Sequence, residues 1–229
     1  MNVFRSRKLS IDLIWNLLLL YKEEKEKEIP MNTYKIVKKP EILDWSLIPS
    51  ASINHPYQSD GVDITASAQL CYDDSALYVH LSAKEANIRA EGTGLLDAPC
   101  EDSCLEFFFS PIQGDIRYIN FEYNPNCCVY VGMASCVEDL VRFIPEFEFP
   151  FSPKVNRTED GWDITYTIPY SFVRRYFPGF SPVSGYEMRG NFYKCGDLTN
   201  PPHYFTWNEL SGNVLSFHRP CDFGLLVFE

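Results

Sequence analysis

Hydrophobic and polar residues alternate with a period of two along several stretches of the chain. In residues 64–72 every second side chain is apolar, and those between include Thr65, Ser67 and Gln69. Residues 76–83 alternate again after an Asp-Asp-Ser turn. Such alternation is typical of β-strands with one buried face. The two stretches therefore predict a hairpin with a polar outer face.

The same pattern predicts most of the remaining elements. Strands are expected in residues 105–109, 116–123, 128–131, 162–168, 187–195 and 223–228, and one short helix in residues 170–177. Sixteen prolines and twelve glycines favour many short strands joined by turns. Long segments of 3.6-residue period, which a helical bundle or a parallel α/β fold needs, are missing. About ten short strands and one helix predict an all-β fold, an antiparallel β-sandwich of the jelly-roll or immunoglobulin-like type.

The first thirty residues differ from the rest. Basic residues precede a short apolar run in residues 11–20, and alternating Lys and Glu follow it. A signal peptide would show a small-residue cleavage site here, and the run is too short to span a bilayer. Lys27-Glu28 can be encoded by a purine-rich ribosome-binding sequence two codons ahead of Met31. We expect residues 1–30 to be an extension that is not translated natively, residues 31–229 to form the domain, and the protein to be cytoplasmic rather than secreted.

Composition narrows the class of partner. With 45% hydrophobic and 15% aromatic residues, the chain can build a sizeable core. Its net charge of −11 disfavours nucleic acid and anionic membranes, because phosphates require Lys and Arg. The eight cysteines form no CxxC pair and no Cys/His spacing typical of a zinc site. We expect reduced thiols that behave as small apolar residues.

Several segments, taken in order, resemble those of a known family. They are Ala76–Val79, Glu101–Pro111, Tyr118–Glu122, Arg189–Tyr193, Trp207 and Phe217–Gly224. Their order and spacing are similar to family 9 carbohydrate-binding modules and their relatives in the DOMON-like group, over roughly residues 40–229. The resemblance implies a bacterial β-sandwich that binds sugars without catalysis, serves carbohydrate catabolism, and is commonly attached to glycoside hydrolases. No catalytic domain or export signal accompanies this chain, so a stand-alone relative is expected.

The candidate site follows from the chemistry of sugars. A sugar presents apolar C–H faces and a ring of hydroxyls, so its site needs an aromatic face and fixed polar groups. Trp207 is the expected aromatic platform for a mono- or oligosaccharide. The alternation groups polar side chains on one outward sheet face beneath it, and Arg89 is an additional loop donor. The polar face is expected to hold Glu106, Asn120, Glu122, Arg189, Asn191 and Tyr193.

Two other functions stay open at this point. Glycosidases use two carboxyl groups roughly 5–10 Å apart, and Glu101, Asp102 and Glu106 are close in sequence. We nevertheless expect no enzyme activity, because two of the three belong to a loop edge. A sandwich that binds another protein through the same aromatics is the second alternative.

No cofactor is expected. Asp60, Asp63, Asp73 and Asp74 could bind calcium, but ordinary turn formation explains them better. Haem would need axial ligands such as a Met133–His218 pair, and the sequence around the histidine reads more simply as the loop before the last strand.

Overall fold

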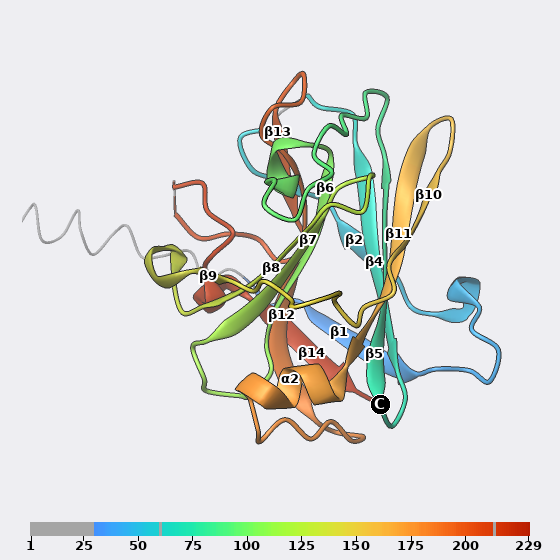
Figure 1. Ribbon diagram of the computed structural model, residues 1–229, viewed down its shortest axis with the longest axis vertical. Helices are drawn as coiled ribbons and strands as arrows, with labels where there is room; N and C mark the ends of the chain where they lie inside the picture. Colours follow the sequence, from blue (N-terminus) through green and yellow to red (C-terminus); the bar gives the residue numbers. More distant parts are fainter. Residues whose placement is uncertain (1–29, 60, 213) are drawn as a thin grey trace, which may run out of the picture. The chain divides into compact units, whose positions relative to one another are not determined.

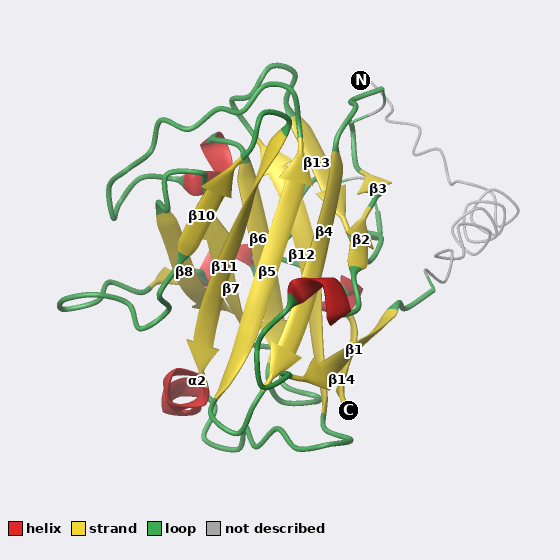
Figure 2. Cartoon of the chain, turned by 90° about the vertical axis from the view of Figure 1, so that its right-hand side faces the viewer, coloured by secondary structure: helices red, strands yellow, loops and turns green. Residues whose placement is uncertain are grey.

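Two β-sheets packed face to face form the protein, as the two perpendicular views in Figures 1 and 2 show. The computed structural model describes residues 30–59, 61–212 and 214–229. The expectations for residues 1–29 lie outside this part of the chain. The strands are β1 (Thr33–Lys38), β2 (Ala51–Ile53), β3 (His55–Pro56), β4 (Thr65–Tyr72), β5 (Ala76–Lys84), β6 (Cys104–Ser110), β7 (Tyr118–Tyr123), β8 (Val129–Ala134), β9 (Val141–Arg142), β10 (Lys154–Arg157), β11 (Gly161–Pro169), β12 (Glu187–Gly196), β13 (His203–Thr206) and β14 (Gly224–Phe228).

The strand order divides into two sheets joined by β1. One sheet, here called the β4–β5 sheet, has the order β10-β11-β5-β4, with β2 beside β4. The other, the β6–β7 sheet, has the order β14-β12-β6-β7-β8-β9, with β13 beside β12 and β3 beside β13. Strand β1 pairs in parallel with β14 and with β4, whereas the other pairings are antiparallel. The predicted antiparallel sandwich is therefore confirmed, with parallel pairing only at β1.

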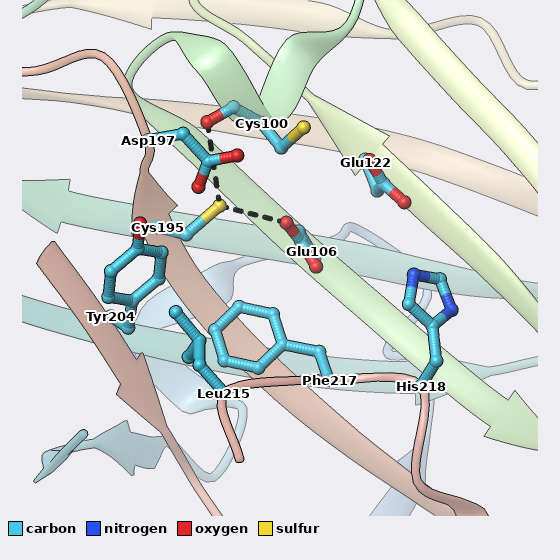
Figure 3. A pocket seen from close by; sticks show the side chains of 9 residues that line it. All are labelled: Cys100, Glu106, Glu122, Cys195, Asp197, Tyr204, Leu215, Phe217 and His218. Carbon is cyan, nitrogen blue, oxygen red and sulfur yellow. Dashed lines mark hydrogen bonds between the residues drawn. The ribbon is translucent and has the colours of Figure 1, made fainter. Parts of the chain in front are cut away.

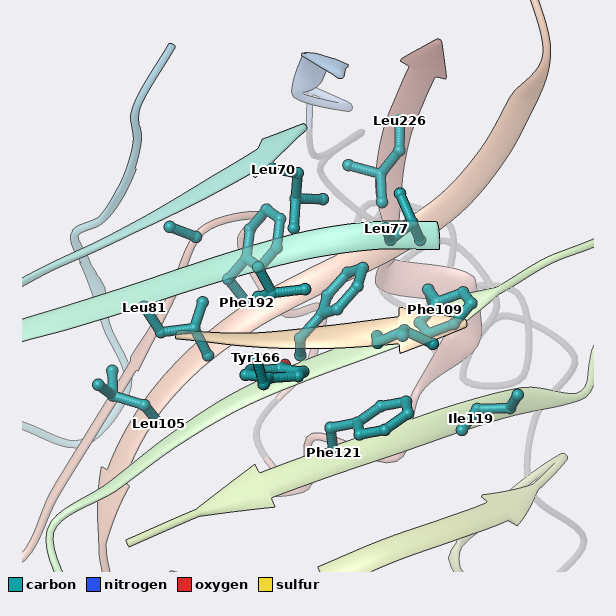
Figure 4. Packing of buried hydrophobic residues seen from close by; sticks show 14 of the residues in the cluster. Leu70, Leu77, Leu81, Leu105, Phe109, Ile119, Phe121, Tyr166, Phe192 and Leu226 are labelled. Carbon is teal, nitrogen blue, oxygen red and sulfur yellow. The ribbon is translucent and has the colours of Figure 1, made fainter. Parts of the chain in front are cut away.

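The predicted alternation places the core where expected. From β6, Leu105, Phe107 and Phe109 belong to the core between the sheets. Ile119 and Phe121 of β7 join them, and Figure 4 shows both beside Leu105 and Phe109. The rings of Phe107 and Phe109 stack with centroids 4.9 Å apart. Side chains two residues apart on a strand share one face, so these phenylalanines form a continuous aromatic row.

The outer face of the β6–β7 sheet is buried as well, which differs from the open polar face that was expected. Every residue of β6 and β7 is buried. Phe108 and Tyr118 stack there at 5.9 Å and belong to a second apolar cluster with Phe223. Phe217 completes the cover from the loop before β14. A second layer therefore lies over the sheet face that carries the candidate polar residues.

The tryptophan expected to be the aromatic platform belongs to the core. Trp207 is only 6% exposed and packs on Phe192, 5.4 Å away, and edge-on against Tyr34 of β1, 6.4 Å away. Its backbone N–H donates to the carbonyl of Phe192, and its carbonyl accepts from the Asn32 side chain. The ring expected to be the platform is therefore buried, because β1 covers it from a distant part of the sequence.

A buried polar network links the two sheets at one edge. The ammonium of Lys194 on β12 lies 3.1 Å from the carboxylate of Glu85, which directly follows β5. The other carboxylate oxygen of Glu85 accepts from the indole N–H of Trp162 at 2.8 Å, and Lys194 also lies 2.7 Å from Nε2 of His203. Removing one partner would leave a buried charge without its counter-charge, so the network fixes this edge of the sandwich.

The predicted short helix is α2 (Tyr170–Tyr176), at one end of the sandwich (Figure 1). It directly continues β11 and buries Tyr170, Phe172 and Val173. All eight cysteines are free thiols. Among the described residues, none belongs to a helix long and apolar enough to cross a membrane.

The place of Trp207 can be tested through Gly224. A Cβ atom at residue 224 would lie 2.5 Å from the Trp207 ring and 2.9 Å from the Asn32 carbonyl. We expect Gly224→Ala to lower the free energy of unfolding by about 1–3 kcal/mol, as overpacking of a core does. Gly179→Ala is the matched control, because its Cβ would meet only Ile112 at 3.6 Å. Equal denaturant midpoints for both variants would contradict a Trp207 ring held against β14.

The buried network predicts a pH dependence. Burial lowers the pKa of His203 to about 4, whereas an unfolded histidine titrates near about 6.5. Between these values the unfolded chain binds a proton that the folded chain does not, so stability falls as the pH drops from 6.5 to 4. The loss from this histidine is at most about 3 kcal/mol.

Comparison with His203→Gln isolates this contribution. The glutamine retains a polar group opposite Lys194 and removes the titration. Above about pH 7.5 the unfolding free energies of the two proteins should differ by a constant, since the histidine is neutral in both states there. Below that pH the wild type should lose more stability than the variant. Parallel curves down to pH 4 would show that His203 does not make this contribution.

Candidate functional site

A pocket of about 260 Å³ opens on the outer face of the β6–β7 sheet. Figure 3 shows its side chains converging from β6, β7, the end of β12, β13 and the loop before β14. We call it the acid pocket, because three carboxyl groups line it. Its lining residues are Cys100, Glu106, Glu122, Cys195, Asp197, Tyr204, Leu215, Phe217 and His218.

Strand register brings two of the carboxyl groups together. Glu106 of β6 lies directly opposite Glu122 of β7, and Tyr193 of β12 lies opposite Glu106 on the other side. The three side chains form one row across the sheet, on the face away from the core. Directly opposed side chains have Cβ atoms about 4.5–5.5 Å apart, and like charges at that distance destabilise a sheet. The two carboxyl groups therefore cannot both be charged without a cost in stability.

Burial favours the neutral form of these carboxyl groups, which lowers the repulsion between them. Glu106 is 2% exposed, and burial followed by the nearby Glu122 raises its pKa well above the usual range. Burial also raises the pKa of Glu122 to about 7, although the Asn120 amide and the Arg142 guanidinium oppose it. Burial raises the pKa of Asp197 too. At neutral pH the pocket thus offers protonated carboxyl groups that donate hydrogen bonds and ionised ones that accept them.

Aromatic side chains cover the opposite side of the pocket. The Phe217 ring stacks on Tyr193 with centroids 4.1 Å apart and planes 8° from parallel. The Tyr193 hydroxyl donates to the Phe217 carbonyl at 3.1 Å, which fixes the loop as well as the ring. Tyr204 on β13 meets Phe217 edge-on at 6.3 Å. An aromatic wall therefore faces the carboxyl groups.

A neutral imidazole stands at one side of the pocket. Nδ1 of His218 lies 2.8 Å from the Tyr118 hydroxyl, and the ring packs against Phe108. Burial lowers the pKa of His218 to about 4, so the ring is uncharged at neutral pH. It supplies one further hydrogen-bonding nitrogen without adding a charge.

The structure brings together part of the predicted polar face. Glu106 and Glu122 line the acid pocket. Tyr193 supports the aromatic wall of the pocket. Asn120 lies in the neighbouring row of side chains and donates a hydrogen bond of 2.8 Å to a Glu122 oxygen. Asn191 is fully buried and bonds the backbone of Asn208 through both its amide nitrogen and its oxygen. By strand register these side chains share the outer face of the sheet, but only Glu106 and Glu122 line the pocket themselves.

Neither predicted arginine lines the acid pocket. Arg89 pairs with the buried carboxylate of Asp102, which also accepts from the backbone of a neighbouring loop and from Asn124. Arg189 donates to the carbonyl of Phe223 at 3.0 Å and lines a different hollow. By strand register Arg189 lies on the same sheet face as Glu106, but its side chain holds the segment before β14, and the expected loop donor Arg89 holds a different loop. Asp102 is paired with Arg89, and Glu101 is exposed. These two carboxyl groups therefore do not meet Glu106 in the acid pocket, as the hydrolase alternative would require.

Asp60 lies outside the described residues, and none of the other aspartates suggested for calcium belongs to a described group of three possible metal ligands. Asp73 accepts from the backbone of Ser75 and from the Tyr78 hydroxyl, as expected of a turn aspartate. Met133 packs against the core between the sheets, whereas His218 lies on the outer face of the β6–β7 sheet. The proposed axial pair is thus on opposite faces.

Sequence reasoning missed most of the pocket wall. Cys195 lies near the end of β12, which was predicted, but Asp197 belongs to the loop beyond it, which carries no periodic signal. Phe217 and His218 were noticed only as residues before the last strand. An aromatic residue followed by a histidine beside a closing strand was the one available signal. Their position over Glu106 depends on tertiary packing, which spacing does not reveal.

Comparisons with known proteins agree with this architecture. The sequence profile of carbohydrate-binding family 9 matches residues 38–228. Among solved structures, a Bacteroides uniformis ATCC 8492 protein assigned to carbohydrate binding is 25% identical, with a TM-score of 0.75 and coverage of 87% of this chain and 100% of that one. No curated protein matches the chain.

Two further structures are family 9 modules of Caldicellulosiruptor kristjanssonii. The structure in complex with glucose has a TM-score of 0.60 and covers 96% of that module. The structure in complex with cellotriose has a TM-score of 0.62 and covers 94% of that module. Each is 15% identical to this chain and covers 86% of it. At that identity the likeness shows the fold alone. The family profile, however, spans most of the chain. The protein therefore belongs to carbohydrate-binding family 9, a family of non-catalytic modules.

Proposed function

We propose that the protein binds one sugar residue of a mono- or oligosaccharide in the acid pocket. The observation that carries the proposal is the convergence of Glu106, Glu122 and Asp197 opposite the aromatic wall of Phe217 and Tyr204. Sugar hydroxyls both donate and accept hydrogen bonds, which suits carboxyl groups of mixed protonation. The apolar C–H face of the ring suits the aromatic wall.

The dimensions of the pocket favour a single ring. Pockets that enclose a drug-sized ligand measure roughly 300–1,000 Å³, and the acid pocket, at about 260 Å³, falls just below that range. Glucose and cellotriose in the two Caldicellulosiruptor modules make glucose and its β-linked oligomers the first ligands to test. In this proposal the aromatic contact comes from Phe217 instead of Trp207, and Glu122 is the main polar partner at the rim.

Calorimetric titration with glucose, cellobiose and cellotriose tests the proposal. We expect Glu122→Gln to weaken binding about tenfold, since a hydrogen bond to a charged group contributes about 1.5–3 kcal/mol and the amide retains part of it. Phe217→Leu should weaken binding several-fold, because an aliphatic side chain has no ring face for the sugar to stack on.

Glu148→Gln is the matched control, because Glu148 is exposed in a loop remote from the pocket and the charge change is the same. It should bind as the wild type does. Wild-type affinity in both pocket variants, with their folding verified by circular dichroism, would place the sugar elsewhere. An absence of binding across a broad sugar panel would overturn the proposal.

A further inference from the structure

Two thiols and a carboxyl group meet at the base of the acid pocket. Cys104 of β6 lies directly opposite Cys195 of β12, and Glu106 follows Cys104 on the same face. The Sγ atoms and a Glu106 oxygen lie within 4.8 Å of one another, and Cys195 Sγ is 2.9 Å from that carboxyl group. All three side chains are buried.

This donor set offers sulfur and carboxylate ligands of the kinds that bind zinc. Zinc is bound by Cys sulfur at about 2.3 Å and by carboxylate oxygen at about 2.0–2.2 Å, so tetrahedral ligand atoms lie roughly 3.3–3.8 Å apart. The three atoms need only small side-chain rotations to reach that spacing. Calcium and magnesium prefer all-oxygen sites, so two sulfur donors select a softer ion.

The surroundings also favour a cation. Glu122 and Asp197 line the same pocket, and none of the ion pairs among the described residues involves either of them or Glu106. The nearest buried lysine, Lys194, points to the other face of the sheet and is paired with Glu85. The Arg142 guanidinium acts on Glu122 without forming an ion pair with it. A buried group of acids without an ion-pair partner is stabilised when a divalent ion replaces their protons.

We propose that Cys104, Cys195 and Glu106 bind one Zn²⁺ ion. Cys195 and Glu106 line the acid pocket (Figure 3), so the fourth coordination position faces the open space of the pocket and is filled by water. Binding releases the two thiol protons and the carboxyl proton to solvent, with no change in oxidation state. The ion is held by the protein alone, so the site does not require the proposed sugar.

Cobalt is a suitable probe, because Co²⁺ takes tetrahedral thiolate sites and its sulfur-to-metal charge-transfer absorption reports the ligands. The full-length protein is reduced, freed of metal with a chelator and titrated with Co²⁺ in the absence of sugar. We expect the absorption to saturate at one ion per chain and to disappear when Zn²⁺ is added. Zn²⁺ should also raise the melting temperature with increasing concentration.

Variants identify the ligands. Cys104→Ser and Cys195→Ser should each weaken Zn²⁺ binding by more than ~100-fold, since loss of an outer-shell contact already costs ~10–100-fold. Glu106→Gln, which retains both thiols, should weaken it while keeping sulfur-to-cobalt absorption. The matched controls Cys136→Ser and Cys221→Ser remove exposed thiols and should bind as the wild type does.

Three results would overturn the proposal. One is wild-type protein that shows no sulfur-to-cobalt absorption and no zinc-dependent rise in melting temperature. Another is unchanged absorption in Cys104→Ser or Cys195→Ser. The third is a Cys104–Cys195 disulfide, found by mass spectrometry, that persists in the reduced preparation. The first and third results are measured on the wild-type protein, so they remain decisive even if a cysteine variant fails to fold. None of the three results depends on sugar binding.

Discussion

The position of β6 between β7 and β12 is the constraint on which both the core and the site depend. Both neighbours pair with it in antiparallel register, so its side chains alternate between two buried faces. One set supplies the aromatic row of the core, and the other supplies Cys104 and Glu106 to the pocket. A shift of the register by one residue would exchange the two sets and bury the carboxyl group among phenylalanines. The packing of the core therefore also fixes the geometry of the site.

The alternation of apolar and polar residues was sufficient to predict strand β6 and its two faces. It did not predict the layer of side chains that covers the outer face. The longer strands of the β6–β7 sheet, and the shared face of Glu106, Asn120 and Glu122, follow from period-two patterns and from the resemblance to family 9. The short strands β2, β3, β9 and β13 have too few residues to show a period. Phe217 was missed and the role of Trp207 was misjudged for a different reason: each ring is buried by a segment distant in sequence, and no local pattern records that contact.

Among the described residues, the acid pocket holds buried acids that belong to no ion pair. Elsewhere in the described chain buried charges have partners, such as Lys194 with Glu85 and Asp102 with Arg89. In the pocket, protonation lowers the cost of burying acids, and any ligand that offers hydroxyl groups or positive charge lowers it further. Sugar and zinc would satisfy the same set of groups from different sides, the sugar from the aromatic wall and the metal from the base of the sheet.

Strand β1 has a consequence for the order in which the protein folds. It comes first among the described strands, yet it pairs with β14, the last of them, and Tyr34 and Ile36 become buried only in that arrangement. A ribosome must synthesise nearly two hundred residues between these two strands before they can meet. Until then β12 lacks one neighbour and the ring of Trp207 lacks its cover. The growing chain therefore exposes an unpaired strand edge and apolar surface during synthesis, so its vulnerability to aggregation ends only when β14 has left the ribosome.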